Sequence, residues 1–303
     1  MSSSQPGPLH GAIDTHVHSA PDVVPRLYSD IDVTRCAKDA GMGALVLKNH
    51  YTPTTARAQI AESVVGGLRV IGGVVLNTAC TGGFGVEAVR ANLDMGAQII
   101  WMPTVSARNH IDYVTRAPVS AHITALTRGS DDIGLSPLTP NGRVSDAVSA
   151  ILDLIAERAA TLATGHLSPD ETACLIDAAR HRGVRRVIVT HPEAPQIRMP
   201  LAVQCDLAGE DVFFERCYYS LLAGDTVATV IEAIRIVGVS STILATDLGQ
   251  IGNPSPVDGL ADYHRLLTAE GMTDTEWRTM VIANPARALG ISADLEAQMD
   301  GAR

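Results

Sequence analysis

The chain has 303 residues, of which 46% are hydrophobic and 18% charged, and its formal net charge at pH 7 is -10. These values are typical of a folded globular protein and exclude a disordered or membrane-spanning chain. The acidic balance, with no run of Lys and Arg, argues against nucleic acid as a partner, because binding phosphates requires a basic surface.

The first eight residues, MSSSQPGP, have no basic start and no apolar segment, so we expect residues 1–10 to form a flexible tail. No stretch reaches the roughly eighteen apolar residues of a membrane span. The five cysteines are scattered without CxxC spacing, which argues against disulfides and a thiolate zinc site. We therefore expect a cytoplasmic protein without a membrane partner. Assembly into a homo-oligomer is possible from the sequence.

Short apolar runs rich in strand-forming residues recur along the chain, and each precedes a segment with helical spacing. They begin near Ala12, Ala44, Arg69, Gln98, Thr161, Arg186, Val212 and Thr242. Eight strands with crossover helices are the number that closes a parallel barrel. The sequence therefore predicts a single α/β domain, a (β/α)8 TIM barrel over residues 11–290, with residues 291–303 as a C-terminal tail.

The first strand ends in Ile13-Asp14-Thr15-His16-Val17-His18. Alternate strand residues share a face, so His16 and His18 can bind one metal ion together. The turn-rich loop that follows ends at Arg26. Its guanidinium could hold a substrate carboxylate through two hydrogen bonds, or form a structural ion pair with Asp22.

The fourth strand is followed by a long connection, residues 104–142, in which the sequence has no strong period. Connections of this length commonly form a lid or a binding loop, and the alternative is a surface excursion without a role in catalysis. We take Arg108 and His110 as its candidate substrate contacts. His50, at the end of the second strand, is a third.

Helix signals support the division into strand and helix pairs. Ser168-Pro169-Asp170-Glu171 predicts a capped helix that ends before Gly183. Thr273 and Glu276 predict another capping box. An apolar stripe on a further helix is made by Val148, Ile151, Leu152 and Ile155.

Three later strands also end in residues that bind divalent metals: His166 after the fifth, His191 after the sixth and Asp247 after the eighth. All strands of a parallel barrel end at one rim, where barrel enzymes have their sites. Imidazoles and a carboxylate suit zinc, with manganese or iron as alternatives, and an ion with an open position makes bound water nucleophilic near neutral pH. The seventh strand ends in Glu215-Arg216-Cys217-Tyr218-Tyr219, from which a Tyr or Arg could polarise a carbonyl.

This order of residues resembles the amidohydrolase superfamily, whose barrels carry HxH after strand one, His after strands five and six, and Asp after strand eight. The resemblance spans nearly the whole chain and includes the segment 284–290, similar to the closing segment of many members. It implies that His16, His18 and Asp247 bind one metal ion, with His166 and His191 binding a second or contacting substrate. Asp247 would also act as proton shuttle, a role that suits a carboxylate beside activated water.

The chain departs from that pattern after the fourth strand, where many members have a carbamylated Lys or a Glu that bridges two ions. Lys48, after the second strand, could bridge two ions as a carbamate, bind substrate through its positive charge, or form an ion pair with a neighbouring carboxylate such as Asp14. The site is therefore expected to hold one or two ions. The resulting hypothesis is a hydrolase of a small-molecule amide, cyclic amide or related C–N or ester bond, in which metal-bound hydroxide attacks a polarised carbonyl. Alternatives are a phosphoester or lactone hydrolase, a decarboxylase and a non-catalytic binding barrel.

Overall fold

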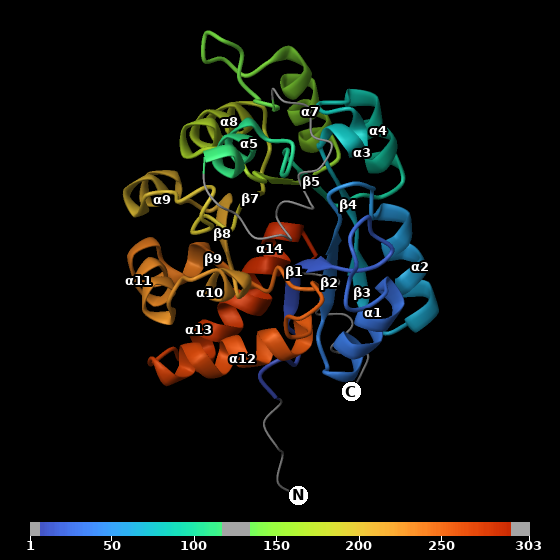
Figure 1. The fold of residues 1–303 in the computed structure, drawn as a ribbon, viewed down its shortest axis with the longest axis vertical. Helices are drawn as coiled ribbons and strands as arrows, with labels where there is room; N and C mark the ends of the chain where they lie inside the picture. The colour runs from blue at the N-terminus through green and yellow to red at the C-terminus, as the bar shows by residue number, and fades with distance from the viewer. Residues whose placement is uncertain (1–6, 117–133, 292–303) are drawn as a thin grey trace, which may run out of the picture.

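The structure is a computed structural model that describes residues 7–116 and 134–291. Strands and helices alternate along it (Figure 1). The strands are β1 (Ile13–His18), β2 (Ala44–Lys48), β3 (Arg69–Ile71), β4 (Gly73–Val75), β5 (Ile99–Trp101), β6 (Thr161–Ala163), β7 (Val187–Thr190), β8 (Val212–Cys217) and β9 (Thr242–Ala245). The eight predicted starts each lie within one residue of an observed strand start. The third predicted strand is formed by β3 and β4 together.

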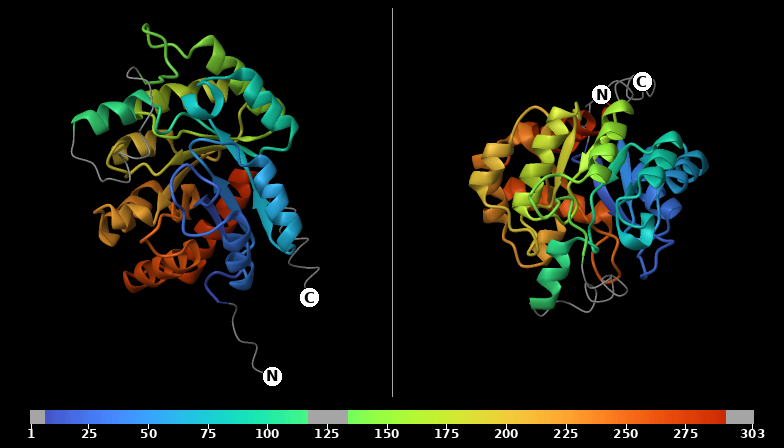
Figure 2. Two further views of the ribbon diagram at one scale, coloured as in Figure 1. Left: turned by 45° about the vertical axis from the view of Figure 1, so that its right-hand side comes forward. Right: turned by 90° about the horizontal axis from the view of Figure 1, so that it is seen from above.

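Helices follow the strands and form the outer layer of the molecule (Figure 2). They are α1 (Asp30–Asp39), α2 (Thr55–Val65), α3 (Thr78–Thr81), α4 (Val86–Asp94), α5 (Arg108–Arg116), α7 (Asp146–Glu157), α8 (Pro169–His181), α9 (Leu201–Leu207), α10 (Tyr219–Leu222), α11 (Val227–Val237), α12 (Pro256–Ala269), α13 (Asp274–Arg278) and α14 (Asn284–Leu289). A 3-10 turn, η1 (Val239–Ser241), and a π-helical turn, η2 (Thr279–Ala283), complete the set.

All strand pairings are parallel, in the order β1-β2-β3 and β4 through β9. The Thr54 hydroxyl connects the two sheets by joining β2 to β4, since it donates to Leu47 O at 2.7 Å and accepts from Gly73 N at 3.0 Å. The last strand joins the first through Asp247 N to His16 O, 2.9 Å, and His18 N to Leu248 O, 2.8 Å. These contacts close the (β/α)8 barrel that the sequence predicts.

The hydrophobic core has two layers, one inside the barrel and one between strands and helices. Strands buried on both faces are expected where helices cover a parallel sheet. The inner layer includes Ile13, Trp101 and Phe213 and continues into α14, whose Ala288 and Leu289 pack beneath the strands. α14 therefore covers the end of the barrel opposite the rim that carries the strand ends.

The predicted helix signals are confirmed. Ser168 and Thr273 each form a capping box, at α8 and α13, and α8 ends at His181, before Gly183. The four residues of the predicted stripe on α7 are fully buried.

The expectation of a connection without periodic structure after the fourth strand needs correction, because α5 (Arg108–Arg116) forms within it. Residues 117–133 of the expected lid lie outside the described residues, as do 1–6 and 292–303 of the two expected tails. Of the expected N-terminal tail, Leu9 is buried in the core, and Pro8 O accepts from Trp277 Nε1 at 2.8 Å. Within the described ranges, no helix has the length and apolarity to cross a membrane.

Candidate metal centre

Three predicted ligands meet at the rim where the barrel closes. Oδ1 of Asp247 lies 3.1 Å from Nε2 of His16 and 3.1 Å from Nε2 of His18. Two ligands of a tetrahedral ion with bonds of about 2.0–2.1 Å are separated by about 3.3 Å. These three side chains, from opposite ends of the sequence, thus converge as a metal-binding set would.

A bulge in β1 orients His16. Between Asp14 and Val17 the pairing with β2 shifts, so that three steps along β1 match two along β2. Neighbouring residues then share a partner: Thr15 Oγ1 donates to Oε1 of Glu215 at 2.5 Å, and His16 Nδ1 donates to Oε2 at 2.9 Å. Bulges often re-aim side chains beside active sites.

The Glu215 contact supports metal binding by His16. With Nδ1 donating to Glu215, the lone pair of Nε2 is free to accept a cation, and Nε2 lies 3.1 Å from Oδ1 of Asp247 and 3.0 Å from Nζ of Lys48. Carboxylate partners of this kind are typical of metal-binding histidines. Burial by itself lowers the pKa of His16, but the carboxylates of Asp247 and Glu215 outweigh it and raise this pKa. The donor set therefore fits a divalent metal ion.

Five imidazoles form a closed ring around the mouth of the barrel. Successive ring centroids lie 5.3 Å apart for His16 and His18, 5.0 Å for His18 and His50, and 6.2 Å for His50 and His166. The ring continues over 5.0 Å from His166 to His191 and closes over 5.8 Å to His16. The structure thus brings the four predicted metal-binding histidines and the predicted substrate contact His50 to one place.

His110 extends this ring from α5. Its Nδ1 lies 2.9 Å from Nδ1 of His166, and both rings are buried. Burial lowers the pKa of His110 to about 4 and that of His191 to about 4, and it lowers the pKa of His166 well below its usual value. These imidazoles are therefore neutral at pH 7, the form that binds metals. Arg108, two residues earlier on α5, is exposed.

Asp247 is the charged group at the centre. Burial opposes its ionisation, but the charges and hydrogen bonds of His16 and His18 dominate and hold its pKa well below the usual range. Its φ of 54° lies in the left-handed region, as does the φ of 28° at His191. Non-glycine residues in this region are often found at functional sites, where the surrounding structure holds the strain.

Two glycines allow the rim segments to approach. A Cβ on Gly249 would lie 1.8 Å from His18 O, and one on Gly165 would lie 2.4 Å from Met102 O. Both residues have positive φ. Glycine at these positions lets the segments carrying Asp247 and His166 lie directly against their neighbours.

Lys48 lies inside the barrel, 1% exposed, with Nζ 3.0 Å from Nε2 of His16 and above the Trp101 ring. Burial lowers its pKa, which the carboxylates of Asp247 and Glu215 partly offset. Asp14, named as one carboxylate that could pair with Lys48, is held elsewhere, because it accepts hydrogen bonds from Thr246 N and Oγ1 and from His16 N. A carbamate, a cationic contact with substrate and an ion pair with another neighbouring carboxylate remain as predictions for Lys48.

At the end of β8, Arg216 and Tyr218 are held by other partners, so Tyr219 is the residue left for the expected Tyr or Arg that polarises a carbonyl. Burial and the nearby charge of Asp247 raise the pKa of Tyr219. Arg216 points out of the barrel, where it contacts Glu193 and donates to Gln204 at 3.0 Å. Tyr218 donates to Asp262 on α12 at 3.0 Å. The inward residues are Glu215 and Cys217, the latter with Sγ 3.9 Å from Nδ1 of His16.

Sequence reasoning did not select Glu215. The available signal was a carboxylate within the otherwise apolar run Val-Phe-Phe-Glu-Arg-Cys, since a buried charge in a strand needs a partner.

The fold and the converging His and Asp side chains define the class of protein: a (β/α)8 barrel with a candidate metal centre at its rim. A solved amidohydrolase from Pseudomonas aeruginosa is similar over 93% of this chain and 96% of its own, with 12% identity and a TM-score of 0.59. A 2,6-dihydroxybenzoate decarboxylase from Rhizobium covers 93% and 99%, with 12% identity and a TM-score of 0.53. An organophosphorus hydrolase variant from Deinococcus radiodurans covers 92% and 93%, with 13% identity and a TM-score of 0.52.

The model of one protein family matches residues 11–215, two thirds of the chain. The chain therefore belongs to that family, described as Family of unknown function (DUF6282). Among curated proteins, no sequence matches it.

Proposed function

We propose that this protein is a metal-dependent hydrolase that cleaves an amide, cyclic amide or related C–N or ester bond of a small molecule. His16, His18 and Asp247 hold a divalent ion, for which we propose zinc. His166 and His191 bind a second ion or contact substrate, and His50 and His110 border the same space. The barrels of similar fold include proteins named as hydrolases, which supports this general kind of chemistry.

One observation carries the proposal: a single Asp247 oxygen lies 3.1 Å from two imidazole nitrogens, one of which is oriented by Glu215. An ordinary structural ion pair would not need two histidines from alternate β1 positions, an aspartate with positive φ and a buried second carboxylate. A bound divalent ion would supply Lewis-acid activation of water and of the scissile carbonyl.

Asp247 is placed to move the proton in this reaction. As an ionised carboxylate beside the proposed ion, it could accept a proton from the attacking water and return it to the leaving nitrogen or oxygen. The neutral imidazoles of His166 and His191 can bind or donate without adding positive charge. Burial of these groups excludes bulk water and strengthens their electrostatic effect.

Decarboxylation is the second candidate. It is supported by Arg26, whose guanidinium lies near His18 and could hold a carboxylate, and by the decarboxylase among the similar folds. The two reactions differ in their products, because a decarboxylase releases carbon dioxide without incorporating water. Product analysis in ¹⁸O-labelled water therefore distinguishes them.

Elemental analysis of the purified protein tests the metal site. We expect a divalent ion in the wild type and its loss in His16→Ala and His18→Ala. His181→Ala, which removes an exposed imidazole on α8, is the matched control and should retain metal. Absence of metal from the wild type even after incubation with zinc or manganese would refute the proposal.

The substrate class is tested with a panel of lactams, imides, N-acyl compounds, lactones and phosphoesters. We expect turnover of a lactam, imide or N-acyl compound that is abolished in His16→Ala and retained in His181→Ala. Turnover confined to phosphoesters would replace the proposed bond type with the phosphoester alternative. A metal-loaded wild type without turnover in the panel, but with carbon dioxide release from an aromatic acid, would favour the decarboxylase.

A further inference from the structure

Arg26 is a buried cation that keeps two of its nitrogens unpaired. The side chain is 1% exposed, and its Nε donates to Oδ2 of Asp22 at 2.6 Å. Among the described residues, neither Nη1 nor Nη2 has a hydrogen-bond partner, although both atoms are buried. Leaving a buried charged donor unsatisfied is costly, so such a group in a native protein requires an explanation.

The ion pair with Asp22 determines which part of the guanidinium is available. Both Asp22 oxygens are used, Oδ2 by Arg26 and Oδ1 by Val23 N at 2.6 Å. Asp22 therefore holds the guanidinium by its Nε side. The remaining edge, Nη1 and Nη2, is a two-pronged donor with the spacing of the two oxygens of a carboxylate.

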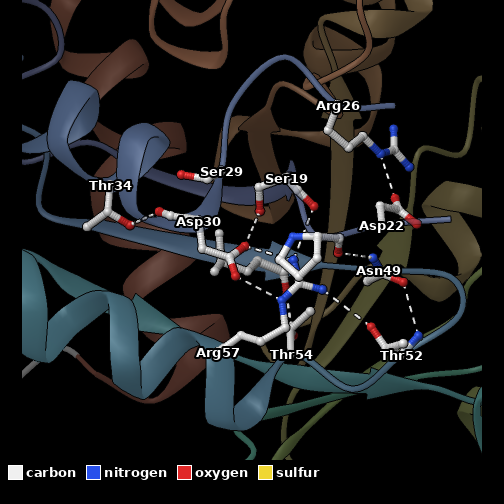
Figure 3. Close-up of polar contacts among 12 residues, drawn as sticks. Ser19, Asp22, Arg26, Ser29, Asp30, Thr34, Asn49, Thr52, Thr54 and Arg57 are labelled. Carbon is white, nitrogen blue, oxygen red and sulfur yellow. Dashed lines mark hydrogen bonds and ion pairs between the residues drawn. The ribbon is translucent and has the colours of Figure 1, made fainter. Parts of the chain in front are cut away.

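Polar contacts on both sides hold the loop that carries Arg26 (Figure 3). Asp30 accepts from Ser19 Oγ at 2.6 Å and from Arg57 Nε and Nη2 at 2.8 Å each, and Arg57 also donates to Ser19 O. On the other side of the loop, Leu27 N donates to Gly249 O at 2.9 Å, and the backbone of Arg26 forms an antiparallel β-bridge with that of Gln250. The Arg26 backbone is thus fixed to the segment that carries Asp247.

The Arg26 segment lies against the rim, because its bridge partner Gln250 donates through Nε2 to Asp247 O at 2.9 Å. After burial, the charge of Arg26 is the largest influence that lowers the pKa of His18, and it also contributes to the lowered pKa values of His50 and Lys48. Beside it, Val24 and Val105 form a small apolar cluster with Tyr51. The same loop therefore offers a paired donor and an apolar wall next to the candidate metal ligands.

We propose that Arg26 is a substrate-recognition residue and that the substrate is a small organic acid, whose carboxylate binds Nη1 and Nη2 while its apolar part contacts Val24, Val105 and Tyr51. This inference rests on the proposed function only in taking the rim as the place where substrate binds. A monoanionic carboxylate is favoured over a phosphate because Asp22 already offsets part of the guanidinium's charge. A phosphate dianion would keep an uncompensated charge near Asp22 and Asp247.

Calorimetric titration tests the inference with three probes of similar shape: cyclohexanecarboxylate, cyclohexanecarboxamide and cyclohexyl phosphate. We expect the wild type to bind the carboxylate at least about tenfold more tightly than either other probe. Arg26→Gln and Arg26→Lys should each weaken carboxylate binding about tenfold or more, because Lys retains the charge but lacks the paired donors. The amide should bind all variants equally.

Arg35→Gln is the matched control, because it removes an exposed arginine of α1 that pairs with Asp32. Its carboxylate affinity should stay within about twofold of the wild type. Arg26→Lys retains a cation for Asp22, so it keeps the test valid if Arg26→Gln unfolds. Unchanged carboxylate affinity in Arg26→Lys, or preference of the wild type for the amide or the phosphate, would overturn the inference.

Metal content, measured on the same samples, separates this inference from the proposed function. Arg26-dependent carboxylate binding in a protein that takes up no metal would refute the metal site and retain the subsite. A metal-loaded, active protein whose carboxylate affinity does not change in the Arg26 variants would refute the carboxylate subsite and retain the metal site.

Discussion

Glu215→Gln tests whether the buried carboxylate of β8 orients His16 for metal binding. Glu215 is 1% exposed, and its two oxygens bind Thr15 and His16. The amide has the same shape, and its NH2 can donate to the Thr15 hydroxyl while its carbonyl still accepts from His16 Nδ1. The substitution therefore removes the charge and retains the geometry.

We expect metal affinity to fall about 10–100-fold, the usual effect of losing such an outer partner. This corresponds to about 1.4–2.8 kcal/mol of binding free energy. Thr15→Val removes only the hydroxyl contact and leaves the His16 to Glu215 hydrogen bond in place, so its effect on metal affinity should be several-fold smaller. Glu215→Gln should therefore weaken metal binding more than Thr15→Val, because only Oε2 of Glu215 contacts His16 and Thr15 contacts Oε1.

Competition with a chromophoric chelator measures the affinities for zinc and manganese. Glu210→Gln, which removes an exposed carboxylate before β8, is the control and should bind metal like the wild type. Circular dichroism confirms that each variant is folded. If Glu215→Gln binds metal as tightly as Glu210→Gln while His16→Ala does not bind it, the assigned orienting role of Glu215 is incorrect.

Three further predictions concern the rim. Asp247→Asn should reduce the turnover rate about 10²–10⁴-fold while the metal content falls less. Turnover and elemental analysis are measured on the same sample. Equal losses of rate and metal would make Asp247 a metal ligand without a proton-transfer role. Lys48→Arg should retain activity if Lys48 is a cationic contact, whereas activity lost in Lys48→Ala and rescued by bicarbonate with a short-chain acid would identify a carbamate. Gly249→Ala should lower the free energy of unfolding in urea by at least about 1–3 kcal/mol, because the new Cβ would overlap His18 O. Gly252→Ala is the control, since Gly252 also has a positive φ but has open space around it. Equal losses of stability in the two variants would mean that backbone strain, and not the overlap, causes the effect.

Local signals in the sequence determined the barrel. Eight apolar runs separated by helical segments identify the strands, because burial on both faces requires continuous apolar residues. Ser168 and Thr273 mark helix starts, because their side chains satisfy backbone donors only a few residues away. Parallel strands also end at one rim, so His16, His18, His166, His191 and Asp247 could be assigned to that rim from their positions after the strands alone.

Contacts between residues far apart in the sequence were decided only by the tertiary structure. Whether Glu215 or Arg216 faces inward depends on strand register, and the bulge that turns both Thr15 and His16 toward Glu215 has no local signature. The choice of His16 as the partner of Lys48, in place of Asp14, likewise depends on which side chains already hold the Asp14 carboxylate. Sequence periodicity specifies which residues are buried, whereas the partner of each buried polar group is determined by how the closed barrel brings distant strands together.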